Sequence, residues 1–432
     1  MIHSFTWAQK HVGETGKVIK SDRSIAWVTD LPGAVLGEGI SFASGAHGMV
    51  TKLGEDYTEV MSFHDTAIPI GEEAARTNEP LKISVGEGMC GDTFDALGHI
   101  TSTQKEPSKY SENRPVEQEA WTMDKRSAIK DFLATGVTIV DTVVPIAKGQ
   151  RELIIGDQKT GKTTFLTQTV ITQAQAGTIC IIALVGKEQS EIVRLEQTLR
   201  QTKVDHNCII IAEPAKSSAA RLTLVPFSAM AVAEHFRDQG KDTLVIIDDL
   251  SYHAIRYREM AILSDRFPGR DSYPSDIFYL HARLLERAGS FMVDGKSVTI
   301  TCLPTVTTVD GDISGYIATN IMSMTDGHLY FDKNLFFDGV RPAINIFLSV
   351  TRVGRQTQSK EARAWGQRIL TTMSEYSELK RFLRFGTELT DHIKESIRLA
   401  HGLKDLLKQN ANTRVDPSTQ LAMLEKLWKG KS

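Results

Sequence analysis

The residues with the clearest chemical role in this chain lie at positions 156–163. They read Gly-Asp-Gln-Lys-Thr-Gly-Lys-Thr, an uninterrupted G-x-x-x-x-G-K-[ST] pattern. In such a loop the backbone amides point at phosphate oxygens, the lysine neutralises the β and γ phosphates, and the last hydroxyl holds Mg²⁺. We therefore expect ATP or ADP to bind here with Mg²⁺. The candidate nucleotide-binding residues are Gly156, Asp157, Gln158, Lys159, Thr160, Gly161, Lys162, Thr163 and Thr164.

The sequence on both sides of the loop agrees with this prediction. Residues 151–155 form a run typical of a buried strand. Leu166, Val170 and Ala174 recur at four-residue spacing, which predicts a helix with one buried stripe. A strand before the loop and a helix after it would place the amides of the helix N-terminus at the phosphates.

The second candidate element is a pair of acids that follows another apolar run. Residues 243–247 end in Asp248 and Asp249, which is the Walker B arrangement. Because parallel sheets bind ligands at the carboxyl ends of their strands, we expect Asp248 and Thr163 to hold Mg²⁺ or its bound water.

A hydrolytic base is expected beyond the neighbouring strand, where a carboxylate would polarise the attacking water. The sequence there reads Gly186-Lys187-Glu188. A lysine is no base at neutral pH unless its pKa is strongly lowered, whereas Glu188 could act if it faced the phosphates. Side chains alternate along a strand, so only one of the two is expected to face inward.

An arginine ends a further strand-like run, at Arg352. Its guanidinium could reach the γ-phosphate of its own site or of a neighbour's, or it could form an ordinary surface salt bridge. Spacing alone leaves these alternatives open.

The elements that carry these residues indicate three domains. Residues 1–78 contain short β-type runs broken by glycines, which predicts a small β-barrel or sandwich. Residues 79–355 alternate apolar runs with helical patterns, which predicts a parallel sheet covered by helices on both faces. Residues 356–432 have a helical pattern, with Asp416 and Pro417 as a helix start. The strand candidates of the central domain are Leu153–Ile155, Thr178–Val185, Cys208–Ala212, Leu244–Ile247 and Ser297–Cys302.

The composition argues against several classes of function. Hydrophobic residues make up 41% and charged residues 24% of the 432 residues, the balance of a soluble globular protein. A net charge of −3 gives no basic excess for nucleic-acid binding. The longest apolar stretch, Ile179–Val185, is far shorter than the ~20 residues of a transmembrane helix. Any membrane association is therefore expected to come through partners.

Several stretches, taken together, resemble the α subunit of F-type rotary ATP synthases, from about residue 15 to about residue 410. The loop start Gly156-Asp157 and the run Asp248–Ser251 are typical of α rather than of the catalytic β subunit. The resemblance implies a multidomain protein with an N-terminal β-barrel, a central RecA-like α/β domain and a helical C-terminal domain. The other matching stretches are Gly149–Ile155, Ser272–Pro274, Phe278–Arg287, Gly311–Ser314, Arg341–Asn345 and Thr351–Gly354.

The resemblance also implies a function. In that family α binds MgATP without turning it over and alternates with catalytic β subunits in a ring of three α and three β subunits around a γ-type central stalk. The complex moves protons or sodium ions through a membrane sector, so the chain is expected in the cytoplasm, peripheral to the inner face of the cell membrane or of an equivalent energy-converting membrane. The family has glutamine where this chain has Lys187, so the position still lacks a carboxylate. Arg352 matches an arginine finger that acts in trans on the adjacent β subunit.

Other residues are assigned by the same resemblance. Phe278 and Arg283 match an adenine pocket, with Gln409 as a further candidate, and Lys159 replaces a glutamine of the family's loop. About fourteen residues precede the first matching strand. The expectation is therefore a chain shortened at both ends relative to the family, which puts attachment to a peripheral stalk in doubt.

Two other functions use the same core motifs. A self-sufficient homo-hexameric ATPase, such as a secretion-type motor, would need Glu188 as its base. A hexameric RNA translocase would need a basic N-terminal barrel, and residues 1–78 have no basic excess.

Overall fold

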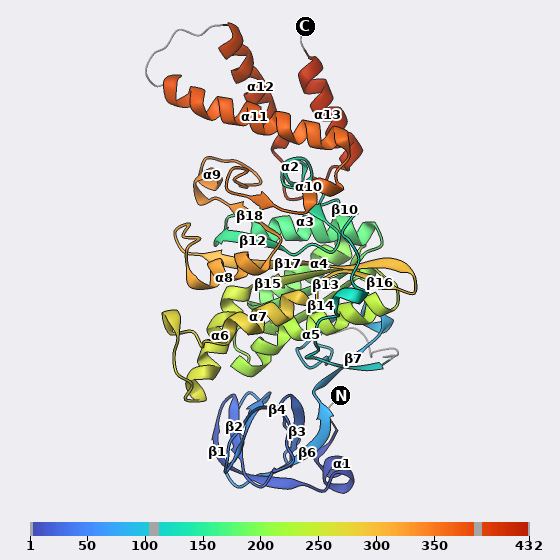
Figure 1. Ribbon diagram of the computed structural model, residues 1–432, viewed down its shortest axis with the longest axis vertical. Coiled ribbons are helices and arrows are strands. Elements are labelled where there is room, and N and C mark those ends of the chain that lie inside the picture. The colour runs from blue at the N-terminus through green and yellow to red at the C-terminus, as the bar shows by residue number, and fades with distance from the viewer. Residues whose placement is uncertain (1–2, 103–111, 384–390, 431–432) are drawn as a thin grey trace.

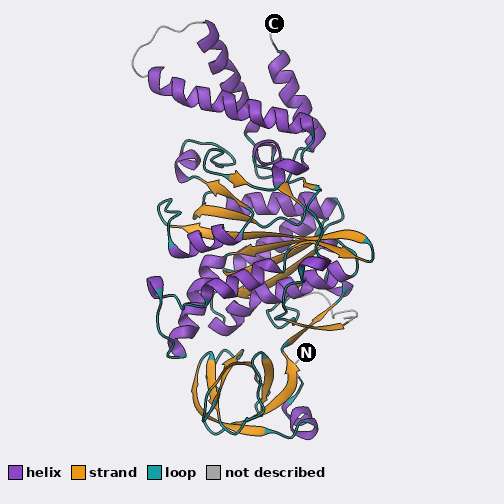
Figure 2. Cartoon of the chain, in the orientation of Figure 1, coloured by secondary structure: helices purple, strands orange, loops and turns teal. Residues whose placement is uncertain are grey.

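The computed structural model describes residues 3–102, 112–383 and 391–430, which form three domains along the long axis of the molecule (Figure 1). A β-barrel lies at one end, an α/β domain in the middle and a group of helices at the other end, as the colouring by secondary structure shows (Figure 2). This arrangement confirms the predicted fold class.

Six antiparallel strands close the N-terminal barrel in the order β1-β2-β5-β4-β3-β6. Their alternate apolar side chains fill its interior, among them Val18, Ile40 and Phe42. The strands are β1 (Thr15–Asp22), β2 (Ile25–Val28), β3 (Glu38–Phe42), β4 (His47–Leu53), β5 (Thr58–Ser62) and β6 (Glu73–Pro80), preceded by helix α1 (Phe5–His11).

The central domain is built on one sheet with the strand order β19-β18-β12-β17-β15-β13-β14-β8. All neighbours from β18 to β8 are parallel, and β19 pairs antiparallel with β18 at the edge. The strands are β8 (Thr93–Phe94), β12 (Glu152–Asp157), β13 (Ile179–Lys187), β14 (Cys208–Pro214), β15 (Thr243–Asp248), β17 (Lys296–Thr308), β18 (Gly327–Phe331) and β19 (Val350–Thr351), and β16 (Gly289–Val293) pairs with β17.

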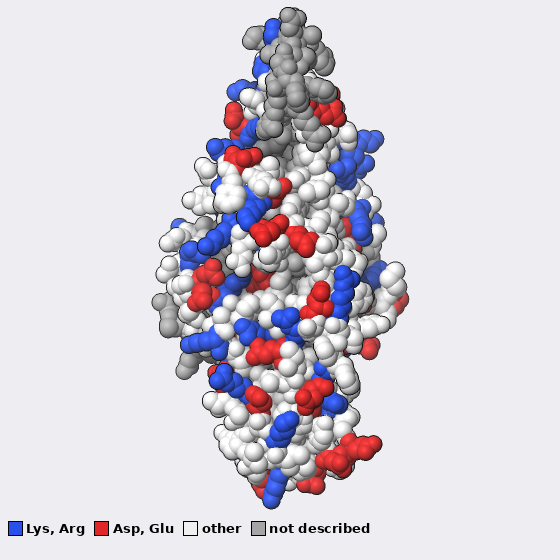
Figure 3. Space-filling model, turned by 90° about the vertical axis from the view of Figure 1, so that its left-hand side faces the viewer, with Lys and Arg blue, Asp and Glu red and all other residues white. Residues whose placement is uncertain are grey.

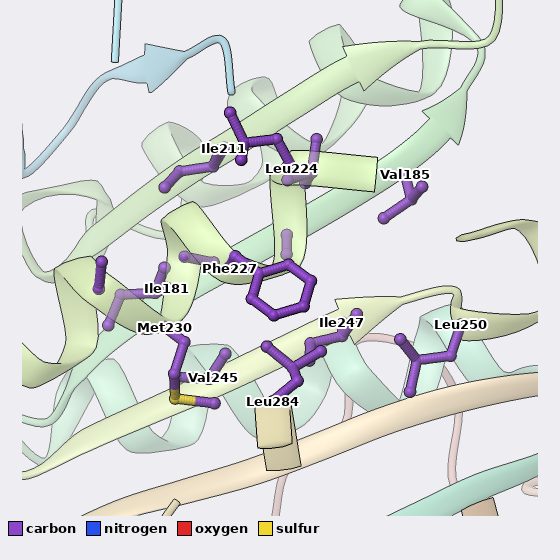
Figure 4. Close-up of a cluster of buried hydrophobic side chains, with 14 of the residues drawn as sticks. Ile181, Val185, Ile211, Leu224, Phe227, Met230, Val245, Ile247, Leu250 and Leu284 are labelled. Atoms are coloured by element: carbon purple, nitrogen blue, oxygen red, sulfur yellow. The ribbon is translucent and has the colours of Figure 1, made fainter. Parts of the chain in front are cut away.

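Both faces of this sheet are buried, which is why its strands are continuous apolar runs rather than alternating ones. Ile181 and Val245 belong to the core on one face, against α5, while Ile182 and Ile246 belong to the core on the other. Figure 4 shows the first of these cores, with Phe227 of α5 among the strand side chains. The covering helices are α3 (Lys162–Gln175), α4 (Gln189–Gln201), α5 (Ala219–Asp238), α6 (Leu250–Leu263), α7 (Ile277–Glu286) and α8 (Tyr316–Met324).

The C-terminal helices pack on the second face of the central domain. Trp365, Leu403 and Leu424 are buried in the same core as Phe165 of α3. Asp416 caps the last helix by accepting a hydrogen bond from the amide of Thr419, with Pro417 in the first turn, as the sequence predicts. The helices are α11 (Lys360–Leu383), α12 (Asp391–Leu407) and α13 (Pro417–Lys429), with short α2 (Thr138–Val143), α9 (Lys333–Phe337) and α10 (Gly354–Thr357) between them and the sheet.

The five strand candidates of the central domain all form strands. The strand-like run expected before Arg352 contains β19, whereas the sequence analysis did not predict the short strands β8 and β18. Four further short strands pair outside the main sheet, as β7 (Lys82–Val85) with β9 (Glu112–Pro115) and β10 (Phe132–Leu133) with β11 (Ile146–Ala147).

A pair of buried histidines joins α6 to α7. His253 Nε2 donates to the carbonyl oxygen of Thr223 at 3.0 Å, so its Nδ1 accepts a hydrogen bond from His281 Nε2 at 3.1 Å. Burial lowers the pKa of His253 to about 4 and also lowers the pKa of His281 well below its usual value, with the neighbouring His253 adding to the effect. Both rings are therefore neutral in the folded protein.

We expect this pair to make the fold sensitive to acid. Unfolded histidine binds a proton near pH ~6.5, whereas folded His253 does so only near pH 4, so stability is lost as the pH falls through this window, by up to about 1.4 kcal/mol per pH unit for each ring. The measurement is the apparent urea midpoint across the window. His253→Gln should show a shallower fall than the wild type, while His206→Gln, at an exposed position, should not. Equal slopes for His253→Gln and the wild type would contradict this account.

Candidate functional site

The phosphate-binding loop joins β12 to α3 and is shaped by two glycines. A Cβ on Gly156 would lie 2.3 Å from the carbonyl oxygen of Phe331 on the neighbouring strand, so the close approach of β12 to β18 requires glycine here. Gly161 caps the helix with a φ of 102°, a conformation that favours glycine. The first amides of α3, which have no partner within the helix, are thereby turned toward the space in front of the loop.

Lys162 lies inside the loop. Its Nζ donates to the carbonyl oxygens of Gly156 at 2.6 Å and Asp157 at 2.8 Å. Burial lowers the pKa of Lys162 to about 8, although the nearby Asp249 and Asp248 oppose the shift. The ammonium is thus held by the loop's own backbone at the place where phosphates are expected.

Other loop side chains have different surroundings. Asp157 turns toward the sheet, where its Oδ1 accepts hydrogen bonds from Thr308 Oγ1 at 2.5 Å and from the amide of Gly311 at 2.8 Å. Thr160 donates to the carbonyl oxygen of Asp157 at 2.7 Å. These hydrogen bonds hold the loop against the end of the sheet. The side chains of Gln158, Lys159, Thr163 and Thr164 are exposed.

The two acids after β15 point in different directions. Asp248 Oδ1 accepts a hydrogen bond from Thr305 Oγ1 at 3.0 Å and forms an ion pair with Lys187 Nζ at 2.9 Å. Asp249 caps α6 by accepting from the amide of Tyr252 at 2.6 Å. Burial raises the pKa of Asp249, and the adjacent charge of Asp248 adds to this. Asp248 is therefore paired with Lys187, whereas Asp249 belongs to the start of α6.

A β-bulge determines which residue at the end of β13 points into the site. The pairing of β13 with β14 slips between Val185 and Lys187, at Gly186, whose φ is 67°. A Cβ there would lie 1.9 Å from the ring of Tyr252. Simple alternation from Leu184, which faces the site, would have put Glu188 inward. The extra residue of the bulge turns Lys187 inward instead and leaves Glu188 exposed at the start of α4.

Burial lowers the pKa of Lys187, but the carboxylates of Asp248 and Asp249 outweigh this effect, and the net shift is upward. The lysine is therefore a cation and cannot act as a base. The position at which a hydrolytic carboxylate is expected is thus occupied by the cation Lys187, which forms an ion pair with Asp248.

Lys187 and Asp248 line a cavity of about 400 Å³. It begins at Thr163 and Thr164, passes Lys187 and Asp248, and extends between α3 and α4 to the segment 411–414. Glu191 also lines it, half-exposed, on the first turn of α4. The sequence analysis missed Glu191 and the segment 411–414, because neither belongs to a motif and only the packing of α4 and the C-terminal domain brings them here.

The residues proposed for Mg²⁺ fit the ion only in part. Thr163 and Asp248 line the same cavity, and a hydroxyl, a carboxylate and phosphate oxygens are the ligands that Mg²⁺ takes in such sites. However, Asp248 Oδ1 already contacts the ammonium of Lys187 and the hydroxyl of Thr305. A second cation would have to share that carboxylate with a lysine.

Arg352 lies at the other end of the same sheet. Its amide donates to the carbonyl oxygen of Asp326, whose own amide donates to the carbonyl oxygen of Arg151. Arg352 is therefore level with the start of β12, five residues before Gly156, which is ~16 Å along a strand. Its side chain is exposed, directly after the edge strand β19. It cannot reach the phosphates of its own site.

The structure does not bring Phe278 and Arg283 to the phosphate-binding loop. Arg283 forms an ion pair with Glu117 at 2.7 Å and lines a separate cavity of about 330 Å³ between the barrel and the central domain. Phe278 is 39% exposed on α7 and lines neither cavity. Gln409 lies closer, beside the segment 411–414, but its side chain is buried and bonded to the backbone of Thr138 and Gly136.

Comparison with known proteins agrees with this geometry. The fold and the loop define a nucleotide-binding protein, and residues 136–351 match the nucleotide-binding domain of the ATP synthase alpha/beta family. An ATP synthase subunit alpha of Caldanaerobacter subterraneus subsp. tengcongensis is 40% identical over 397 residues, 92% of this chain and 78% of the relative. Those of Dictyoglomus turgidum and Acholeplasma laidlawii are 40% and 38% identical over 93% and 96% of this chain, and 78% and 83% of their own lengths.

The chain belongs to the ATP synthase subunit alpha family. The resemblance stated from the sequence is thereby confirmed, and with it the assignment to a nucleotide-binding family whose members are parts of an enzyme. In the described part of the chain, no helix is both long and apolar enough to cross a membrane.

The two cavities predict which arginine contributes to nucleotide affinity. Arg414→Ala should weaken ATP binding on the order of fivefold, because it removes one partly exposed cation from the cavity that opens at Thr163. Arg283→Ala should leave the affinity unchanged, because Arg283 lines the other cavity. Titration with a fluorescent ATP analogue measures both. A larger loss of ATP affinity in Arg283→Ala than in Arg414→Ala would instead indicate that the base of the nucleotide binds against α7.

Proposed function

We propose that the chain is an α-type subunit that holds ATP or ADP without hydrolysing it and completes the active site of an adjacent catalytic subunit. The observation that carries this proposal is Lys187, which stands at the position of the hydrolytic base and is paired with Asp248 at 2.9 Å. A protonated lysine cannot activate water.

The position of Arg352 supports the second half of the proposal. It is exposed directly after an edge strand and lies ~16 Å along the sheet from its own phosphate-binding loop, so its guanidinium is too far from its own nucleotide but open to a neighbouring chain. An arginine supplied by a neighbour stabilises the negative charge that builds up on a transferring phosphoryl group.

The partners follow from this division of labour. We propose β-type catalytic subunits that alternate with this chain in a ring of three and three, a γ-type central stalk within the ring, and no nucleic acid. Figure 3 supports the last point, since acidic and basic side chains are interspersed on the face shown rather than gathered by sign. Contact with the inner face of an energy-converting membrane would come through the ion-translocating membrane sector of the complex.

Nucleotide binding in this proposal uses Lys162 for the phosphates and the amides at the start of α3 around them. Mg²⁺, where it binds, supplies charge neutralisation between phosphate oxygens, with Thr163 and Asp248 as the residues that would hold it. Because Asp248 is shared with Lys187, the contribution of the ion is weaker than in a site with a free carboxylate.

The arginine finger is tested in a reconstituted complex with a β-type partner. Arg352→Ala should leave the dissociation constant of this chain for ATP unchanged and lower ATP hydrolysis by the complex by about 10³-fold, because only the neighbour's transition state loses a charge contact. Arg355→Ala, another exposed arginine one turn further on, is the matched control and should retain full turnover. Unchanged turnover in Arg352→Ala would show that the finger comes from elsewhere.

The non-catalytic character is tested on the purified chain alone. We expect no ATP turnover above background, because among the residues that the structure describes the acids lining the cavity are Asp248, which is paired, and the half-exposed Glu191. Appreciable hydrolysis, lost in Glu188→Gln or Glu191→Gln, would instead establish the self-sufficient homo-hexameric ATPase. Hydrolysis that survives both substitutions would indicate a contaminating enzyme.

A further inference from the structure

We propose that Lys187 takes over part of the role of Mg²⁺, so that this site binds ATP and ADP with little dependence on a divalent cation. The inference rests on the proposed function in one respect, namely that nucleotide binds at the loop 156–163. It adds that the site binds a nucleotide both with and without a bound metal ion.

The ammonium has the right neighbours for this role. Its Nζ is 2.9 Å from Asp248 Oδ1, and both residues line the cavity that begins at Thr163. An ammonium has three N–H donors, of which Asp248 takes one. The others can reach a phosphate oxygen in the same cavity, so Lys187 can bridge Asp248 to the nucleotide as a metal ion bridges an acid to phosphates elsewhere.

The lysine is held there by the backbone and not by its rotamer alone. The bulge at Gly186, with Tyr252 packed against it, directs the side chain inward. The Lys187 ammonium is partly shielded, since its side chain is 24% exposed. Removing this arrangement would require reshaping the end of β13.

Charge in the site favours the same conclusion. The charges of Asp248 and Asp249 act on two lysines, Lys162 and Lys187. Asp249 is engaged as the cap of α6, which leaves Asp248 as the acid available to a metal ion. A divalent cation near Asp248 would be repelled by Lys187, whereas the phosphates are attracted to both lysines.

The test compares ATP affinity in excess Mg²⁺ with ATP affinity in excess EDTA, on the full chain and by the same fluorescence titration. The wild type should bind ATP with dissociation constants that differ by less than about threefold between the two conditions. In Lys187→Gln the loss of the cation should raise the dissociation constant in EDTA by about tenfold relative to that in Mg²⁺. Lys187→Arg, which keeps the charge, should behave as the wild type.

Two further measurements complete the design. Mn²⁺, followed by its electron paramagnetic resonance, should bind the ATP complex of Lys187→Gln more tightly than that of the wild type, because Asp248 is freed. Lys216→Gln, at an exposed lysine outside the cavity, is the matched control and should change neither readout.

The outcomes separate this inference from the proposed function. Wild-type binding that is lost in EDTA, or equal Mg²⁺ dependence in Lys187→Gln and the wild type, overturns the inference and leaves a nucleotide-binding subunit. Absence of binding in both conditions overturns the proposed function as well. Because the wild type is decisive by itself, the test holds even if Lys187→Gln does not fold.

Discussion

A parallel sheet buried on both faces is the constraint on which the rest of this structure depends. Because the strands run the same way, the carboxyl ends of β12, β13 and β15 must meet at one edge, and each carries a different chemical group there. The phosphate-binding loop, Lys187 and Asp248 are neighbours for this reason, although they are far apart in the sequence. The same constraint places residues at the opposite strand ends far from the nucleotide. Arg352 is one of them, level with the start of β12 and ~16 Å along the sheet from its own phosphate-binding loop.

Within that frame, one local departure from regular structure sets the chemistry. A strand of regular pleat would present Leu184 and Glu188 on the same side and put a carboxylate near the phosphates. The extra residue at Gly186 shifts the pleat by one, so a cation is presented instead. The cation then pairs with Asp248, and this ion pair links the end of β13 to the end of β15.

Much of the fold could be predicted because its signals are periodic or strongly local. The apolar runs of the central strands, the stripe of α3 and the capping of α13 by Asp416 depend on neighbours in the sequence. The sequence identified Lys187 as the residue that stands in place of a carboxylate. Its ion pair with Asp248 depends on a β-bulge, and the only sequence signal of that bulge is a glycine. The segment 411–414 and Glu191 could not be predicted because the packing of a separate domain and helix brings them to the cavity. Arg283 shows the opposite limit, since a matching motif does not determine which cavity its side chain lines.

The site at one end of the sheet and Arg352 at the other are connected in the proposed function, in which the chain has no hydrolytic base of its own. In the proposed function, Lys187 leaves the chain's own site without a base for water, while the lysine charge, paired with Asp248, still attracts phosphates. A site that binds nucleotide without hydrolysing it remains occupied for longer, and an occupied site stabilises the fold that carries it. In this chain that fold includes the edge strand β19 and therefore the backbone position of Arg352, which is fixed by its hydrogen bond to Asp326 beside β12. In the proposed function, nucleotide bound at one end of the sheet thus stabilises the surface at the other end, where Arg352 would face a neighbouring subunit.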